Sequence, residues 1–230
     1  MQASRLAGFF VALEGLDGSG KSTMAERLVE AFTASGLNAI LTREPGGTRL
    51  GEQIRSVLLS DESATMLPEA ETLLFAAARA QLVGEVIRPA LDRGNAVVTD
   101  RFTDSSLAYQ SGGRELDKDA ILAVQQLVTG GLEPDIKILL DLPVEVALRR
   151  RLSHAGEVNR LDKEAIQFHS RVRDAYHFLV EADPGRWRVV DALCSVDQVW
   201  AQVSQAVNLD TLSARRMPSV RQGLNQKVAP

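Results

Sequence analysis

The strongest chemical signal in the sequence is a short stretch that can hold phosphate groups. Residues 15–22 fit the pattern G-x-x-x-x-G-K-[ST] of the phosphate-binding P-loop. Glycines let such a loop turn tightly and approach an anion, and the loop amides and the dipole of the next helix face the phosphates. Lys21 adds a mobile positive charge, and the Ser22 hydroxyl can reach a Mg²⁺ ion. We therefore expect a phosphate site formed by Gly15, Leu16, Asp17, Gly18, Ser19, Gly20, Lys21 and Ser22.

A second group of side chains offers recognition of a flat base. Phe75 and Arg79 lie four residues apart, and therefore on one face of a predicted helix. A ring beside a guanidinium can stack on a base and donate to its carbonyl oxygen. The alternative is a core phenylalanine next to a salt-bridged arginine. Both interpretations remain open at this stage.

The elements around these residues predict an α/β fold. Apolar and β-prone runs predict strands, and apolar residues at helical spacing predict helices between them. The strands are expected at about 9–13, 38–42, 95–99, 136–140 and 187–190. The helices are expected at about 20–34, 50–59, 68–92, 117–129, 143–151, 161–182 and 196–209, with Pro89 ending or bending the long one. This alternation predicts a five-stranded parallel sheet with helices on both faces.

The fold class predicts which distant residues meet. Ligands of open parallel sheets collect at the carboxyl ends of the strands. The P-loop, Arg43-Glu44 and Asp100-Arg101 each follow a predicted strand. We therefore expect these charged groups to share one rim, although the sequence assigns no role to Glu14 or Glu44.

Composition limits the class of protein. A chain of 230 residues with a net charge of −4 suits one domain over about 1–209 and gives no reason to expect nucleic-acid binding. Cys194 is the one cysteine, so no intrachain disulfide is possible and a reducing compartment is expected. The sequence shows no signal-peptide core or membrane span, which favours a cytoplasmic protein without membrane contact. We expect residues 210–230 to be a disordered tail.

Three motifs together resemble the thymidylate kinases, most closely the bacterial ones. They are F-V-A-L-E-G-L-D-G-S-G-K-S-T at 10–23, T-R-E-P-G-G-T at 42–48, and D-R-F at 100–102 followed by S-S-L-A-Y-Q at 105–110. The resemblance covers about residues 8–209. It implies a P-loop kinase fold and transfer of the γ-phosphate of ATP to dTMP, giving dTDP and ADP in dTTP synthesis. It also implies Mg²⁺ as cofactor and a homodimer.

The resemblance also implies roles for individual residues. The eight P-loop residues would bind ATP, with Lys21 acting in catalysis, and Ser22 and Asp100 would hold Mg²⁺. Arg55 and Arg101 would grip the dTMP phosphate, Phe75 would stack on thymine, and Arg79 would bond its O4. Tyr109 would crowd the sugar 2′ position and Asp17 would contact the 3′-hydroxyl. The implied dTMP-binding set is Asp17, Arg55, Phe75, Arg79, Arg101, Ser106, Tyr109 and Gln110, with Asp17 and Arg101 also counted as catalytic.

Family members close a lid over ATP, which here would span about 149–162. The P-loop carries no arginine, so the resemblance is to the group that supplies a catalytic arginine from the lid. Arg150 and Arg160 are the candidates, with Arg151 in reserve. Arginines on a closing loop can exclude water and neutralise charge in the transition state. The simpler alternative is a solvated basic helix end.

Two other functions remain open from the sequence. One is a kinase for a different small nucleoside monophosphate. The other is a nucleotide-binding switch or sensor without turnover, although the acceptor motifs would then have no task.

Overall fold

A five-stranded parallel sheet forms the centre of the molecule, with the strand order β2-β3-β1-β4-β5. The structure is a computed structural model and describes residues 8–153 and 159–208. The strands are β1 (Phe9–Glu14), β2 (Ala39–Arg43), β3 (Ala96–Asp100), β4 (Ile136–Asp141) and β5 (Trp187–Asp191). The predicted α/β fold is confirmed, and each predicted strand is present. The predicted tail at 210–230 and residues 154–158 of the predicted lid lie outside the described residues.

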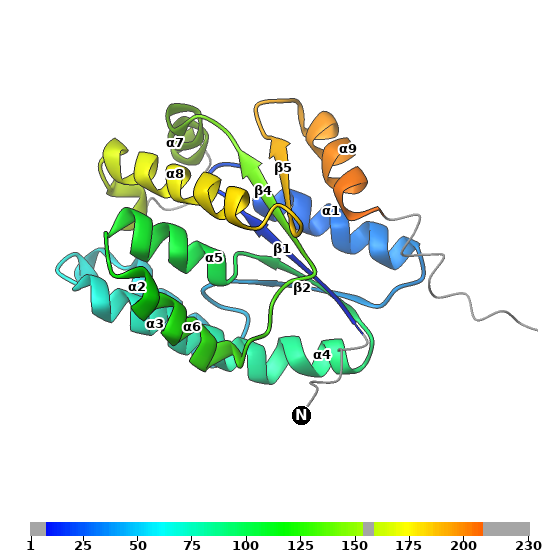
Figure 1. The fold of residues 1–230 in the computed structure, drawn as a ribbon, viewed down its shortest axis with the longest axis horizontal. Coiled ribbons are helices and arrows are strands. Elements are labelled where there is room, and N and C mark those ends of the chain that lie inside the picture. The colour runs from blue at the N-terminus through cyan, green and yellow to red at the C-terminus, as the bar shows by residue number, and fades with distance from the viewer. Residues whose placement is uncertain (1–7, 154–158, 209–230) are drawn as a thin grey trace, which may run out of the picture.

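Helices cover both faces of this sheet (Figure 1). Helices α1 and α9 lie on one side, and α3, α4 and α6 lie on the other. The helices are α1 (Lys21–Ala34), α2 (Arg49–Leu59), α3 (Pro68–Leu82), α4 (Arg88–Asp92), α5 (Thr103–Ser106), α6 (Lys118–Thr129), α7 (Val144–Ser153), α8 (Ile166–Ala182) and α9 (Val196–Val207). Two short 3₁₀ turns, η1 (Asp61–Ser63) and η4 (Leu161–Lys163), and two π-helical segments, η2 (Val83–Ile87) and η3 (Leu107–Gly113), complete the elements. No helix within 8–153 and 159–208 is both long enough and apolar enough to span a membrane.

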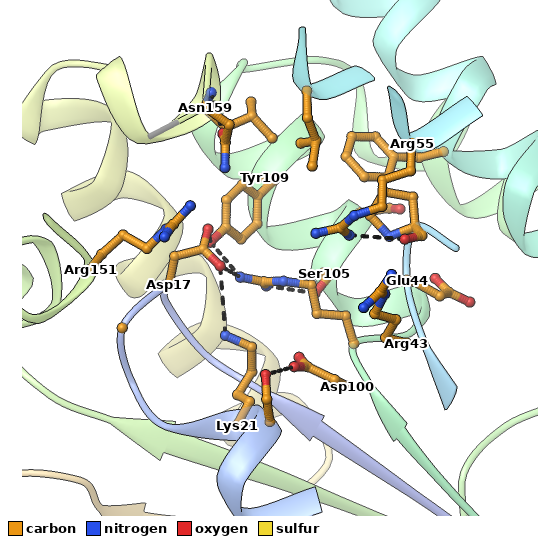
Figure 2. A pocket seen from close by; sticks show the side chains of 18 of the residues that line it. Asp17, Lys21, Arg43, Glu44, Arg55, Asp100, Ser105, Tyr109, Arg151 and Asn159 are labelled. Carbon is orange, nitrogen blue, oxygen red and sulfur yellow. Dashed lines mark hydrogen bonds and ion pairs between the residues drawn. The ribbon is translucent and has the colours of Figure 1, made fainter. Parts of the chain in front are cut away.

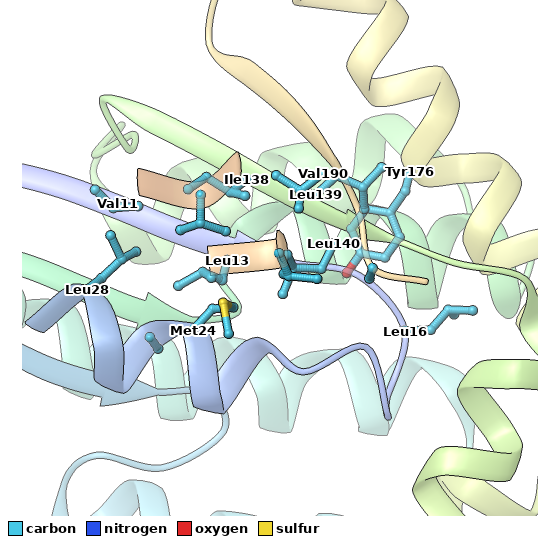
Figure 3. Packing of buried hydrophobic residues seen from close by; sticks show 14 of the residues in the cluster. Val11, Leu13, Leu16, Met24, Leu28, Ile138, Leu139, Leu140, Tyr176 and Val190 are labelled. Atoms are coloured by element: carbon cyan, nitrogen blue, oxygen red, sulfur yellow. The ribbon is translucent and has the colours of Figure 1, made fainter. Parts of the chain in front are cut away.

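The central strand β1 is anchored in a core on each of its faces. Successive side chains of a strand point to opposite faces. Val11 and Leu13 therefore pack with Leu28 of α1 in one apolar cluster (Figure 3), whereas Phe10 packs with Leu82 in the other. Because all of these side chains are buried, the carboxyl end of β1 is held firmly and the loop that follows it starts from a fixed point.

The long helix predicted over 68–92 is helical throughout but is not a single α-helix. The π-helical segment η2 separates α3 from α4. Pro89 has no N–H to donate to the carbonyl of Glu85, so a regular α-helical bond is missing there. The wider turn of η2 lies immediately before this position, as expected for a disrupted helical ladder.

The sequence did not predict the helical stretch from Thr103 to Gly113. Its Thr-Asp-Ser-Ser start and its Gly112-Gly113 end carry no helical apolar period. The stretch is helical because it packs closely on α8. A Cβ added to Gly112 would lie 2.5 Å from the Cβ of Ala175, and one added to Gly113 would lie 2.5 Å from the ring of Phe168. Glycine is therefore required for this close approach, and the packing sets the position of the motif residues on η3.

Candidate active site

One cavity of about 440 Å³ joins the P-loop to the other predicted site residues. Figure 2 shows Lys21 and Asp17 on one side of it, with Arg43 and Arg55 opposite. The predicted residues that line it are Asp17, Gly18, Gly20, Lys21, Ser22, Arg55, Phe75, Arg79, Asp100, Arg101, Ser106, Tyr109 and Gln110. The remaining P-loop residues Gly15, Leu16 and Ser19 belong to the same loop but are not part of this lining. The fold thus gathers both predicted halves of the site.

The P-loop has the backbone shape that its glycines allow. Gly15, Gly18 and Gly20 have φ values of 131°, 85° and 94°, which side chains other than glycine rarely adopt. Lys21 begins α1 and donates from Nζ to the carbonyl oxygen of Leu16 at 2.9 Å. Burial and the charge of Arg101 lower the pKa of Lys21 below its ordinary value. The loop therefore turns a buried cation toward the cavity, where an anion would offset its lost hydration.

Arg101 lines the cavity and is held by contacts to several side chains. Its Nη2 donates to Asp17 Oδ1 at 2.7 Å and to the Tyr109 hydroxyl at 3.0 Å. Its backbone has a φ of 77°, a strained value for an arginine. Burial raises the pKa of the Asp17 carboxyl, but the charges of Arg101 and Lys21 outweigh burial and bring it below its ordinary value. Asp17 is therefore ionised at neutral pH.

Glu14 holds the turn that carries Arg101, a role that the sequence did not reveal. The Glu14 carboxylate is fully buried and accepts from the Phe102 amide at 2.8 Å. It also accepts from the Ser105 and Tyr176 hydroxyls at 2.6 and 2.8 Å. Burial raises the pKa of Glu14, and the hydrogen bonds and Arg101 partly oppose this rise. The sequence feature that could have indicated this role is an acidic residue at the end of a predicted buried strand, directly before the P-loop.

Arg79 lines the cavity although it is buried, with only 1% of its surface exposed. Four hydrogen bonds and one ion pair join its guanidinium to oxygen atoms. Nε donates to Glu44 Oε2 at 2.7 Å, Nη1 donates to the Ser106 hydroxyl at 2.8 Å and to Gln125 Oε1, and Nη2 donates to the Phe102 carbonyl at 2.9 Å and pairs with Glu44. The salt-bridged arginine considered above is thus present, and Glu44 is its partner. Phe75, half-buried, lines the cavity next to it.

Ser22 and Asp100 bring a hydroxyl oxygen and a carboxylate oxygen together in the lining of the cavity. The Ser22 hydroxyl donates to Asp100 Oδ2 at 2.6 Å (Figure 2). Mg²⁺ is usually held by one or two protein oxygens together with waters and substrate phosphates. The described residues contain no cluster of three or more His, Cys, Asp or Glu side chains suited to a metal. A hydroxyl and a carboxylate beside a phosphate loop therefore fit a Mg²⁺ ion that arrives with its nucleotide.

The predicted lid arginines separate into two groups. Arg151 lines the cavity and forms a bidentate ion pair with Asp162. Its Nε donates to Oδ1 at 3.0 Å and its Nη2 lies 2.8 Å from Oδ2. Arg150 instead donates to the Ala192 carbonyl at 2.7 Å. Arg160 is buried against α3, where it pairs with Glu71 at 2.7 Å. The structure therefore brings Arg151, the reserve candidate, to the cavity. It places Arg150 against the Ala192 carbonyl and Arg160 against Glu71.

Comparison with known proteins agrees with this geometry. The family model described as Thymidylate kinase matches residues 13–203. Thymidylate kinase of Thermomicrobium roseum is 48% identical over 203 residues, which cover 86% of this chain and 96% of that protein. The enzyme of Pseudomonas fluorescens is 47% identical over 207 residues, covering 90% and 95%.

A solved structure extends the similarity to three dimensions. The crystal structure of thymidylate kinase from Ehrlichia chaffeensis superposes with a TM-score of 0.69 at 30% identity, covering 87% of this chain and 98% of that one. Sequence motifs, site geometry and relatives of nearly full length agree, and the chain belongs to the thymidylate kinase family.

Proposed function

We propose that this protein is the kinase that transfers the γ-phosphate of ATP to dTMP, giving dTDP and ADP for dTTP synthesis. One observation carries the proposal: a single cavity is lined by the P-loop cation Lys21 and by Phe75, Arg79 and Arg101. Phosphoryl transfer between two polyanions depends mainly on positioning and charge neutralisation. A cavity with cations from both halves meets that requirement.

In the donor half, Lys21 and the loop amides would hold the β- and γ-phosphates of ATP. Ser22 and Asp100 would hold Mg²⁺, Asp100 through water. When bound, Mg²⁺ neutralises negative charge on the phosphate oxygens. The Ser22–Asp100 distance of 2.6 Å supports this assignment, because both oxygens already lie together.

In the acceptor half, Arg55 and Arg101 would bind the dTMP phosphate and Phe75 would stack on thymine. Asp17 would accept from the 3′-hydroxyl, and Tyr109 would leave room for deoxyribose only. For Arg79 to bond O4 of thymine, the base would have to replace or share one of its present acceptors, since each of its three nitrogens already donates to an oxygen atom.

Among the lid arginines, we assign the neutralisation of transition-state charge to Arg151. It lines the cavity, while Arg150 and Arg160 donate to a backbone carbonyl and to Glu71. The Arg151–Asp162 ion pair would open so that the guanidinium could turn to phosphate. This assignment predicts a larger loss of kcat for Arg151→Met than for Arg150→Met.

We also propose a homodimer in the cytoplasm. Leu73 of α3 and Leu122 and Leu127 of α6 are exposed by 59%, 41% and 81% on two helices that contact each other. Large exposed apolar surfaces often mark interfaces. Light scattering on the purified protein should give twice the chain mass of 25.0 kDa.

The test of the function is a panel of acceptors with ATP and Mg²⁺. Turnover of dTMP should exceed that of UMP, CMP, AMP and GMP, and Lys21→Ala should abolish turnover while the circular dichroism spectrum is retained. A clear preference for another monophosphate would assign a different kinase activity. ATP binding without dTMP-dependent ADP release would favour a sensor.

A further inference from the structure

We propose that Glu71 is a positioning residue for pyrimidine recognition: it fixes the polarity of the Gln110 side-chain amide, so that the acceptor Oε1 faces the base. Gln110 lines the cavity. Glu71 lies in the first turn of α3, is not among the residues that line the cavity, and packs against the Gln110 side chain. This inference rests on the proposed function, in which the cavity takes dTMP.

The first step is the environment of Glu71, which is buried to 99%. Its Oε1 accepts from Gln110 Nε2 at 3.0 Å and from Arg114 Nε at 3.2 Å. Its Oε2 accepts from Arg114 Nη2 at 3.0 Å and from Arg160 Nη2 at 2.7 Å. Two guanidinium groups and an amide thus surround one carboxylate.

The second step is the charge of this carboxylate. Burial raises the pKa of Glu71, but the hydrogen bonds and charge of Arg114, with the bonds from Gln110 and Arg160, outweigh burial and lower it below its ordinary value. Glu71 is therefore ionised at neutral pH, and an ionised carboxylate only accepts hydrogen bonds. The Gln110 atom that faces it must be the NH₂ group, since two facing oxygens would repel each other.

The third step is the other end of the Gln110 amide. The bond to Glu71 turns Nε2 toward the carboxylate and leaves Oε1 as the acceptor end of the amide, and Oε1 accepts from no donor within residues 8–153 and 159–208. A fixed acceptor suits the N3–H of thymine. It opposes cytosine, whose N3 is itself an acceptor. The arrangement therefore favours one pyrimidine and rejects the other through the same atom.

Removing the charge of Glu71 should allow the Gln110 side-chain amide to adopt either orientation. In Glu71→Gln the two facing amides can pair in either orientation, so Gln110 can present NH₂ to the base. We expect the ratio of kcat/KM for dTMP to that for dCMP to fall by about tenfold, the factor that corresponds to roughly one hydrogen bond. The KM for ATP should stay unchanged.

A matched control and a rescue make the test specific. Asp141 is another carboxylate that forms a bidentate ion pair with an arginine, since Nε and Nη2 of Arg173 each donate to it at 2.8 Å. Asp141 does not line the cavity, so Asp141→Asn should keep the dTMP-to-dCMP ratio. The double variant Glu71→Gln with Gln110→Glu should restore the ratio. There the amide at position 71 donates to the carboxylate at position 110, whose second oxygen accepts from N3–H.

The outcomes distinguish this inference from the proposed function. If wild-type protein prefers dTMP and Glu71→Gln lowers both substrates equally, the positioning role is refuted and the function stands. If wild-type protein does not use dTMP, the function itself fails. Should Glu71→Gln fail to fold, the double variant decides alone: a retained dTMP preference supports the proposal and a lost one overturns it.

Discussion

Arg101 is held in place by Ser105, which belongs to the third motif, and by Tyr176, which lies outside the three motifs. Its Nη1 donates to the Ser105 hydroxyl at 3.0 Å and to the Tyr176 hydroxyl at 3.3 Å. Tyr176 comes from α8 and also donates to Glu14. Because the backbone of Arg101 is strained, these contacts compensate for a conformation that the residue alone would avoid.

Tyr176→Phe should therefore weaken the acceptor half of the site. The ring remains, but Glu14 loses a donor and Arg101 loses an acceptor. We expect kcat/KM for dTMP to fall by about tenfold and stability by about 1–3 kcal/mol, as for buried groups that lose a hydrogen-bond partner. Steady-state kinetics and urea unfolding measure the two effects.

Thr129→Val is the control for Tyr176→Phe, because it removes a buried hydroxyl that bonds the Gln125 carbonyl outside the described lining. It should lower stability without changing kcat/KM for dTMP. Equal losses for dTMP and ATP in Tyr176→Phe would contradict a specific link to Arg101.

At the scale of residues, the sequence is informative only where chemistry is local. The P-loop and Asp100-Arg101 could be predicted because a few neighbouring residues carry the pattern. Glu14 and Glu71 could not, since their partners come from distant elements: Glu14 and Tyr176 are 162 positions apart. The hydrogen-bond partners of Arg79 were hidden for the same reason, because Gln125 and Ser106 reach it only in the folded chain.

At the scale of elements, the P-loop lies directly against the helix that carries Arg151. A Cβ added to Gly18 would lie 2.2 Å from the Ala147 carbonyl oxygen and 3.0 Å from the Arg151 amide nitrogen, both in α7. Backbone atoms cannot move aside as a flexible side chain can. The P-loop and α7 are therefore in van der Waals contact, which fixes how far the backbone of Arg151 lies from the P-loop.

Gly18→Ala should separate these two elements. Its φ of 85° is unfavourable for alanine and its Cβ has no room, so either the loop or α7 must shift. We expect kcat to fall by at least about a hundredfold, because small displacements of positioned groups are costly. The KM for ATP should also rise, as measured by coupled assay.

Gly84→Ala is the comparison for Gly18→Ala. Gly84 lies in η2, a Cβ there meets nothing within 4 Å, and its φ is not positive. It should leave kcat unchanged and raise the free energy of unfolding by about 0.5–1 kcal/mol. Normal turnover in Gly18→Ala would show that the contact with α7 is dispensable.

The elements themselves were largely predictable, and their exceptions have physical causes. Apolar periodicity found the strands and most helices because burial dictates it. It missed α5 and η3, and in η3 the close approach to α8 requires Gly112 and Gly113 in place of an apolar stripe. It also missed η2, since a π turn follows from the missing amide of Pro89 and not from any pattern of side chains.

At the scale of the whole molecule, a buried ion pair links β4 to the helical stretch after β3. Lys137 Nζ lies 2.7 Å from Asp104 Oδ2 and 3.1 Å from Glu133 Oε2. Both Lys137 and Asp104 are buried. Burial outweighs the attraction of Lys137, and Glu14 and Glu133 add repulsion, so the pKa of Asp104 is raised from 3.8 to about 6.

This shift predicts a pH-dependent stability. Between about pH 4 and 6 the folded protein binds more protons at Asp104 than the unfolded chain does, so unfolding free energy falls as pH rises through this range. The contribution of Asp104 is fully present below about pH 4 and is lost above about pH 6. Asparagine cannot titrate, and Asp104→Asn should therefore be less sensitive to pH. Urea unfolding between about pH 4 and 7.5 should show the wild-type protein losing on the order of 1–3 kcal/mol relative to the variant. A constant difference across this range would mean that Asp104 titrates at its ordinary pKa and that Lys137 fully offsets its burial.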